Sequence, residues 1–243
     1  MLKLRPLIII LSILLLVSIV GNFIGYKTTY TAYDKYNDSR LDPLGEIAWD
    51  LQDDVNGSYE VVIIGDSHAR NWDYNHDRVL NLGIPGQTSV QISHRSLAYR
   101  DSLKGKLLII IGGGNDIKSV STNPGLKDEI VRNCLAALES TVNNHLPSFE
   151  SIAILTVPPV FKIPWKYRTL HSPAIDQAHS EINTGIRLLA KQYNIILLDA
   201  YAILEPQMES KDLSPDGIHL NKQAYACLQV ELASTLGDQS AFD

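Results

Sequence analysis

The sequence predicts an α/β protein, a three-layer α/β/α sandwich with a five-stranded parallel sheet of flavodoxin-like order, preceded by one N-terminal transmembrane helix. Short runs of Ile, Leu and Val alternate with longer segments of helical periodicity. Strand, helix and strand therefore follow one another, which implies parallel pairing. The runs are almost continuously apolar, as in strands that are covered on both faces. A further apolar run at the N-terminus predicts the separate helix.

The apolar runs and the helical patterns place the individual elements. The expected strands are 59–65, 78–82, 107–112, 151–157 and 194–200, and the expected helices are 88–102, 126–146, 174–192 and 222–236. Ser172 and Pro173 suit the N-cap and the first turn of the third helix. Because ligands of open α/β sheets bind outside the carboxyl ends of the strands, we expect the site at that edge.

Residues 7–24 are uncharged and predict a membrane-spanning segment. At ~1.5 Å per residue, a helix of this length just spans a bilayer core of ~30 Å. No small-residue cleavage site is evident and no lipid-attachment cysteine follows, which favours an uncleaved signal anchor over a cleaved signal peptide. The short basic N-terminus is interpreted as cytoplasmic, which exports the rest of the chain, although basic residues lie on both sides of the run. They are Lys3 and Arg5 before it, and Lys27, Lys35 and Arg40 after it.

These patterns divide the chain into three expected parts. Residues 1–25 form the signal anchor, residues 26–57 a linker or stalk, and residues 58–243 the α/β domain.

The net charge is −6 and there is no cluster of Lys and Arg, so nucleic acid is not an expected partner. Neither Cys134 nor Cys227 has metal-ligand spacing, and both are interpreted as small core residues. The histidines show no HExxH pattern, so we expect no metal and no cofactor.

Four short blocks of glycine and polar residues follow the expected strands. They are Gly65-Asp66-Ser67, Gly83-Ile84-Pro85-Gly86, Gly113-Gly114-Asn115-Asp116 and Asp216-Gly217-Ile218-His219. Ser67 has two interpretations, a nucleophile at a strand end or the cap of the next helix. The first block lacks the G-x-S-x-G pattern because position 69 is Ala, and the third lacks G-x-G-x-x-G because position 117 is Ile. On their own, the blocks predict a polar site at one edge of the sheet.

The pattern D-x-x-H occurs three times, and its context separates the three copies. Asp176 and His179 lie inside an expected helix, where a surface i, i+3 pair is the simpler interpretation. Asp73 and His76 closely follow Ser67 and are expected to remain in their own loop. The third copy, at 216–219, contains a glycine, follows Ser-Pro and comes after the fifth strand. It is therefore the copy expected to reach the site.

Taken in order, the four blocks resemble the SGNH/GDSL hydrolase family over about residues 59–236. The resemblance implies that Ser67 is the nucleophile, that His219 is the general base and acid, and that Asp216 orients His219. It also implies an oxyanion hole made by the Ser67 N–H, the Gly86 N–H and the side-chain amide of Asn115. A membrane-anchored serine esterase that works through an acyl-enzyme, without a cofactor, is then expected.

Two features bear on the substrate, which we expect to be an O-acyl ester of a carbohydrate. The G-D-S-H-A stretch resembles SGNH domains that act on the acylation of cell-surface polysaccharides, although His68 also suits a plain first-turn residue. In the loop 158–172, four side chains could contact a sugar, lie on the membrane surface or pack on the domain: Phe161, Trp165, Tyr167 and Arg168. Three alternatives stay open: a polysaccharide O-acetyltransferase with the same triad, a lipid ester or thioester hydrolase, and a non-catalytic envelope binding module.

Overall fold

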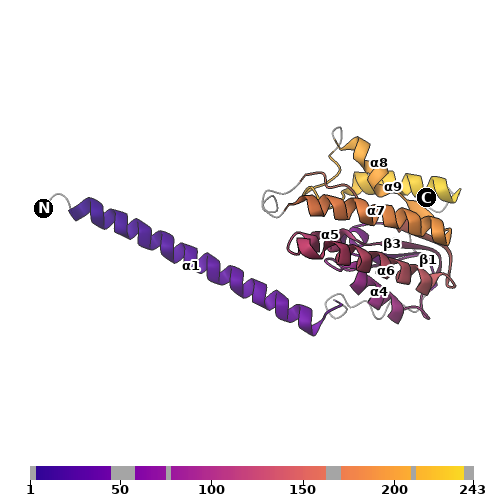
Figure 1. Ribbon diagram of the computed structural model, residues 1–243, viewed down its shortest axis with the longest axis horizontal. Coiled ribbons are helices and arrows are strands. Elements are labelled where there is room, and N and C mark those ends of the chain that lie inside the picture. The colour runs from indigo at the N-terminus through magenta and orange to yellow at the C-terminus, as the bar shows by residue number, and fades with distance from the viewer. Residues whose placement is uncertain (1–3, 45–57, 75–77, 163–170, 209–211, 238–243) are drawn as a thin grey trace. The chain divides into compact units, whose positions relative to one another are not determined.

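The computed structural model describes residues 4–44, 58–74, 78–162, 171–208 and 212–237. The chain divides into two units, Met1–Pro43 and Leu44–Asp243. The first contains one helix, α1 (Leu4–Leu41), which has no buried residue and continues well beyond residue 25 (Figure 1). Among the described residues it is the one helix whose length and composition suit a membrane span or a signal sequence. Within the linker, Leu44, Ile47 and Leu51 predict one short helix, and residues 45–57 of that segment lie outside the described residues.

The second unit contains the predicted five-stranded sheet, and every neighbouring pair of strands is parallel. The strand order is β2-β1-β3-β4-β5, which is the flavodoxin-like order. The predicted fold class is therefore confirmed. The strands are β1 (Ser58–Gly65), β2 (Val79–Gly83), β3 (Lys104–Ile111), β4 (Phe149–Leu155) and β5 (Ile196–Leu198).

Two apolar layers cover the sheet because successive side chains of a strand point to opposite faces. Val62 and Ile64 of β1 contribute to one core, and Val61 and Ile63 contribute to the other. The first core is closed by α4 (Ser89–Ala98), α5 (Gly114–Val120), α6 (Lys127–His145) and α7 (Pro173–Tyr193). The second is closed by α3 (Ser67–Arg70), α8 (Ala200–Leu204) and α9 (Lys222–Leu236) (Figure 1).

The boundaries differ from the expected ones where polar residues continue a strand or a turn interrupts one. Strand β3 begins at Lys104 rather than at 107, because Lys104 and Gly105 pair with Ser58 and Tyr59 of β1. Strand β5 is shorter than expected, since Asn194 has a left-handed conformation (φ 50°) at the end of α7. Ser172 is the N-cap of α7 and Pro173 its first residue, as predicted, although the Ser172 hydroxyl makes no capping hydrogen bond.

Candidate active site

Ser67 lies at the carboxyl end of β1, an interior strand of the sheet, as the first residue of the short helix α3. The N-cap of this helix is Asp66, whose Oδ1 accepts a hydrogen bond of 2.9 Å from the His68 N–H. The interpretation of Ser67 as a cap is therefore wrong. Because Asp66 takes over the capping, the Ser67 hydroxyl is available to another partner.

That partner is the imidazole of His219, whose Nε2 lies 3.1 Å from the Ser67 Oγ. The other ring nitrogen, Nδ1, lies 2.6 Å from the Oδ2 of Asp216. The second carboxylate oxygen accepts hydrogen bonds from the N–H groups of Ile218 (2.9 Å) and His219 (2.8 Å). Serine, imidazole and carboxylate thus form one hydrogen-bonded series.

The surroundings of Asp216 keep its carboxyl group ionised. Partial burial acts to raise its pKa, but the hydrogen bonds from the His219 ring and from two backbone N–H groups outweigh burial and lower the pKa to about 2. An ionised carboxylate beside Nδ1 favours the tautomer that carries its proton there and leaves Nε2 free to accept one. This arrangement can draw a proton from the Ser67 hydroxyl.

The other two D-x-x-H copies lie apart from this series. The His179 ring forms its hydrogen bond with the Val157 carbonyl (3.1 Å) and lies edge-on to Tyr201, while Asp176 is 3.3 Å from His171. The expected surface pair of Asp176 with His179 is therefore wrong: the Val157 carbonyl takes the ring nitrogen. Asp73 lies 3.4 Å from the ammonium group of Lys222, and His76 lies outside the described residues.

The three expected oxyanion donors follow β1, β2 and β3 in turn. Asn115 lies in the first turn of α5, a helix that the sequence did not predict, and its Nδ2 donates to the Gln87 carbonyl (3.0 Å). A side-chain amide has two N–H groups, so one remains for a ligand. Gly86 is exposed at the turn after β2 with φ of 86°. Within the described residues, the N–H groups of Ser67 and Gly86 have no protein acceptor.

The loop after β4 is tied to the Asp216–His219 turn. The N–H groups of Phe161 and Lys162 both donate to the Gly217 carbonyl, at 2.9 and 3.2 Å. Gly217 has φ of 87°, and a Cβ at this position would overlap the Lys162 carbonyl. Phe161 is half-buried against the second core. The three other residues expected to contact substrate lie outside the described residues: Trp165, Tyr167 and Arg168.

Several buried polar groups surround the nucleophile. Burial, together with the nearby Asp116 carboxylate, raises the pKa of Asp66 to about 7. Asp116 is itself buried, and its Oδ2 accepts hydrogen bonds from the N–H (2.8 Å) and hydroxyl (3.0 Å) of Ser89. The His68 ring centroid lies 5.7 Å from that of His219, and burial and the His219 charge lower the pKa of His68 to about 4. His68 is therefore a neutral ring beside the His219 imidazole at physiological pH.

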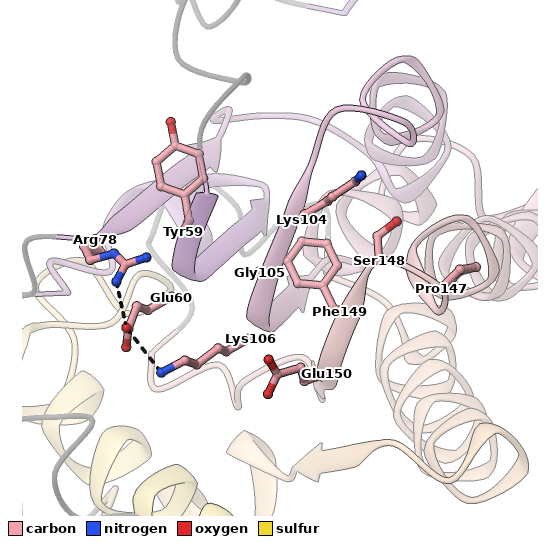
Figure 2. Close-up of a pocket in the computed structure, with 10 residues that line it drawn as sticks. All are labelled: Tyr59, Glu60, Arg78, Lys104, Gly105, Lys106, Pro147, Ser148, Phe149 and Glu150. Atoms are coloured by element: carbon pink, nitrogen blue, oxygen red, sulfur yellow. Dashed lines mark hydrogen bonds and ion pairs between the residues drawn. The ribbon is translucent and has the colours of Figure 1, made fainter.

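A hollow of about 520 Å³ lies elsewhere, at the amino ends of the strands (Figure 2). Glu60 forms ion pairs with Arg78 (3.1 Å) and Lys106 (3.3 Å), which are ordinary pairs of opposite charge between neighbouring strands. The hollow is also lined by Tyr59, Gly105 and Phe149, which lie side by side on the neighbouring strands β1, β3 and β4. This hollow is at the opposite edge from Ser67. In the described part of the chain, no cluster of His, Cys, Asp and Glu could hold a metal ion.

The fold and the site together define a class of protein. A doubly wound sandwich with serine, imidazole and carboxylate in series at the carboxyl edge of its sheet is the architecture of a serine hydrolase. Residues 57–227 match the model of the GDSL-like Lipase/Acylhydrolase family. The chain belongs to this family, and it is a hydrolase that acts on ester bonds. The predicted resemblance is confirmed.

Solved structures agree with the fold. The acetylxylan esterase Axe2 from Geobacillus stearothermophilus matches with a TM-score of 0.57 and 18% sequence identity, covering 76% of this chain and 97% of that one. LAE5, an alpha/beta hydrolase enzyme from the metagenome of Lake Arreo, Spain, matches with a TM-score of 0.58 and 17% identity, covering 75% of this chain and 98% of that one. A search of curated proteins by sequence found no match.

Proposed function

We propose that Ser67, His219 and Asp216 are the catalytic triad of an SGNH-type serine esterase, which removes an O-acyl group through an acyl-enzyme. The observation that carries the proposal is the hydrogen-bonded series from Ser67 Oγ through His219 to Asp216. A serine hydroxyl is a weak nucleophile without a base within hydrogen-bond reach, and His219 Nε2 meets that requirement.

The reaction has two proton-balanced halves. Ser67 Oγ attacks the ester carbonyl while its proton moves to His219 Nε2, and Asp216 stabilises the resulting imidazolium. The N–H groups of Ser67 and Gly86 and the Asn115 amide hold the oxyanion. Collapse of the tetrahedral intermediate breaks the bond to the alcohol oxygen, which takes the proton from His219. Water then attacks the acyl-enzyme by the same route, which releases the acid and regenerates Ser67.

For the substrate, we propose an acetyl ester on a cell-envelope or exported polysaccharide. Axe2, which shares the fold, is an acetylxylan esterase, and the apolar helix α1 suits a protein held at a membrane. We further propose that α1 is an uncleaved signal anchor that places the α/β domain outside the cytoplasm. Full-length protein should then stay in the membrane fraction after high-salt washing, and protease added to spheroplasts should digest the domain. Protection of the domain until lysis would place Ser67 in the cytoplasm.

Activity measurements on the detergent-purified full-length chain test the proposal. Wild-type protein should release acetate from 4-nitrophenyl acetate and from acetylated xylo-oligosaccharides, and Ser67→Ala or His219→Ala should each lower kcat by about 10⁴ or more. The double variant should be little worse than either single one, because the two groups act as a unit. His94→Ala, which changes an exposed histidine on α4, is the matched control and should keep full activity.

The products distinguish the enzyme alternatives. Free acetate indicates hydrolysis, whereas acetyl groups that appear on an added sugar acceptor would indicate an O-acetyltransferase with the same triad. Activity on lipid esters alone would replace the carbohydrate proposal and leave the triad intact. Undiminished activity in Ser67→Ala would contradict the triad, and a folded wild-type protein inactive on every ester would favour a binding module.

A further inference from the structure

Arg95 is a fully buried arginine on α4 that joins two segments of the candidate site. Its exposed fraction is 0%. Its Nε and Nη2 both donate to the side-chain oxygen of Gln87, at 3.2 and 2.9 Å, and Nη2 also approaches the Gly65 carbonyl at 3.4 Å. Gly65 ends β1 two residues before Ser67, and Gln87 directly follows Gly86. The Arg95 guanidinium thus connects the end of β1, just before Ser67, with the residue that follows the glycine turn.

Gln87 extends this connection to the third segment. Its backbone carbonyl accepts the hydrogen bond from the Asn115 amide (3.0 Å), and its side-chain amide donates to the Leu44 carbonyl. The Gln87 side chain is 97% buried, since its exposed fraction is 3%. The Gly65 carbonyl also accepts the Ile84 N–H (2.9 Å), which fixes the start of the glycine turn against β1. The three segments that carry Ser67, Gly86 and Asn115 therefore meet through Arg95 and Gln87.

We propose that Arg95 and Gln87 are positioning residues that hold the three oxyanion donors in a fixed relative geometry. The inference rests on the proposed function, because it gives a role to donors that the proposed reaction needs. Neither residue contacts the reacting atoms. Each acts through another: Arg95 through the Gln87 side chain, and Gln87 through the amide of Asn115.

Physical arguments favour this role over a purely structural one. A buried guanidinium loses its hydration, so the position is expensive unless its hydrogen bonds are needed. Those bonds reach the Gln87 side chain beside the glycine turn and the Gly65 carbonyl at the end of β1, so they join two segments of the candidate site. Oxyanion donors stabilise a transition state only when they are placed beforehand, and a displacement of ~1 Å can cost about a hundredfold in rate. The hydrogen bond that the Asn115 side-chain amide donates to the Gln87 carbonyl sets the plane of a donor in this way.

The test compares Gln87→Ala with Gln87→Glu, which keeps an oxygen acceptor for Arg95. Gln87→Ala should lower kcat on 4-nitrophenyl acetate about tenfold to a hundredfold with KM changed less than about twofold, because the loss occurs in the transition state. Gln87→Glu should recover kcat to within a few-fold. Arg95→Met should resemble Gln87→Ala. Arg187→Met is the matched control and should leave kcat unchanged. It removes an arginine of α7 that pairs with Asp199.

A double-mutant comparison separates positioning from general stability. In an Asn115→Ala background, Gln87→Ala should cost less in kcat than it does in the wild type, since one of the three donors that Gln87 positions is already gone. Equal losses in both backgrounds would overturn the inference. So would a Gln87→Glu variant as slow as Gln87→Ala, or losses that follow the unfolded fraction at the assay temperature. If Arg95→Met does not fold, the two Gln87 variants carry the test alone.

The failure of this inference is distinguishable from failure of the proposed function. If Ser67→Ala is inactive and Asn115→Ala is slow while the Gln87 and Arg95 variants keep wild-type kcat, only the positioning role is wrong. If Ser67→Ala keeps full activity, the proposed function itself is wrong.

Discussion

The Nε2 of His219 lies 3.1 Å from the Oγ of Ser67, although 152 positions separate the two residues in the chain. Ser67 follows the interior strand β1, and His219 comes from the loop before α9. This contact exists because the carboxyl ends of parallel strands share one edge of the sheet, where a late loop can fold back over an early strand. It converts two unremarkable polar residues into a base and its nucleophile.

Removal of the Asn115 amide should slow the reaction without weakening substrate binding. Asn115→Ala should lower kcat by about 10² to 10³ with KM little changed, because an oxyanion donor acts mainly in the transition state. Steady-state kinetics on a small acetyl ester provide the measurement, and Tm is recorded alongside. A variant that loses activity only in proportion to its unfolding would show that Asn115 is a structural residue of the first turn of α5.

Gly217 should tolerate no side chain. Its φ of 87° is unfavourable for other residues, and a Cβ would overlap the Lys162 carbonyl. Gly217→Ala should therefore displace either the Phe161–Lys162 segment or the Asp216–His219 turn, and we expect kcat to fall at least about tenfold. Gly125→Ala is the control, because a Cβ there meets no other atom within 4 Å. Equal activity of the two alanine variants would show that the Gly217 turn is not held by this contact.

Acid should destabilise the domain partly through His145. This ring is fully buried, and burial lowers its pKa from 6.5 to about 4. Between those values the unfolded chain binds more protons than the folded one, so stability falls as the pH falls from about 6.5 to about 4. The contribution of this ring is up to about 3 kcal/mol. His145→Phe should reduce the loss of Tm between about pH 7 and about pH 4.5, and His94→Ala should not. Parallel Tm curves for wild type and His145→Phe would contradict this account.

The two cysteines should be free thiols. Cys134 is buried in α6 against the first core, whereas Cys227 of α9 packs against the second, on the opposite face of the sheet. A disulfide needs Cα atoms within ~7 Å, so the sheet keeps the two thiols apart. In denaturant without reductant, both should react with a thiol reagent, whereas in the native protein the buried Cys134 should react slowly. A denatured mass lower by two hydrogens, restored by reduction, would contradict the topology.

The sequence predicted the fold and the candidate triad because both leave local signals. Apolar runs that alternate with helical segments are enough to imply a parallel sheet. The Gly-Asp-Ser and Asp-Gly-Ile-His blocks follow strands in a recognisable order. The choice among the three D-x-x-H copies depended on whether each copy was expected to lie in a helix or in a loop. The structure joins the third copy to Ser67.

Other features could not be predicted because they depend on contacts between distant segments. Gln87 and Arg95 look like ordinary polar residues of a turn and a helix, and only the fold brings them to Gly65 and Asn115. The capping role of Asp66 depends on the φ and ψ at the strand end rather than on residue type, since Asp and Ser are both good caps. Helix α5 was missed because two glycines begin its segment and lower the helical propensity.

Labelling of the native full-length protein with a fluorophosphonate, followed by peptide mass spectrometry, tests the central claim most directly. A phosphonate reacts with a serine that a base has activated, so the account predicts one adduct per chain on the peptide that contains Ser67. Labelling should be absent in Ser67→Ala, strongly slowed in His219→Ala and unchanged in His94→Ala. A folded wild-type protein that takes up no label, or one that carries the adduct on a serine other than Ser67, would contradict the account.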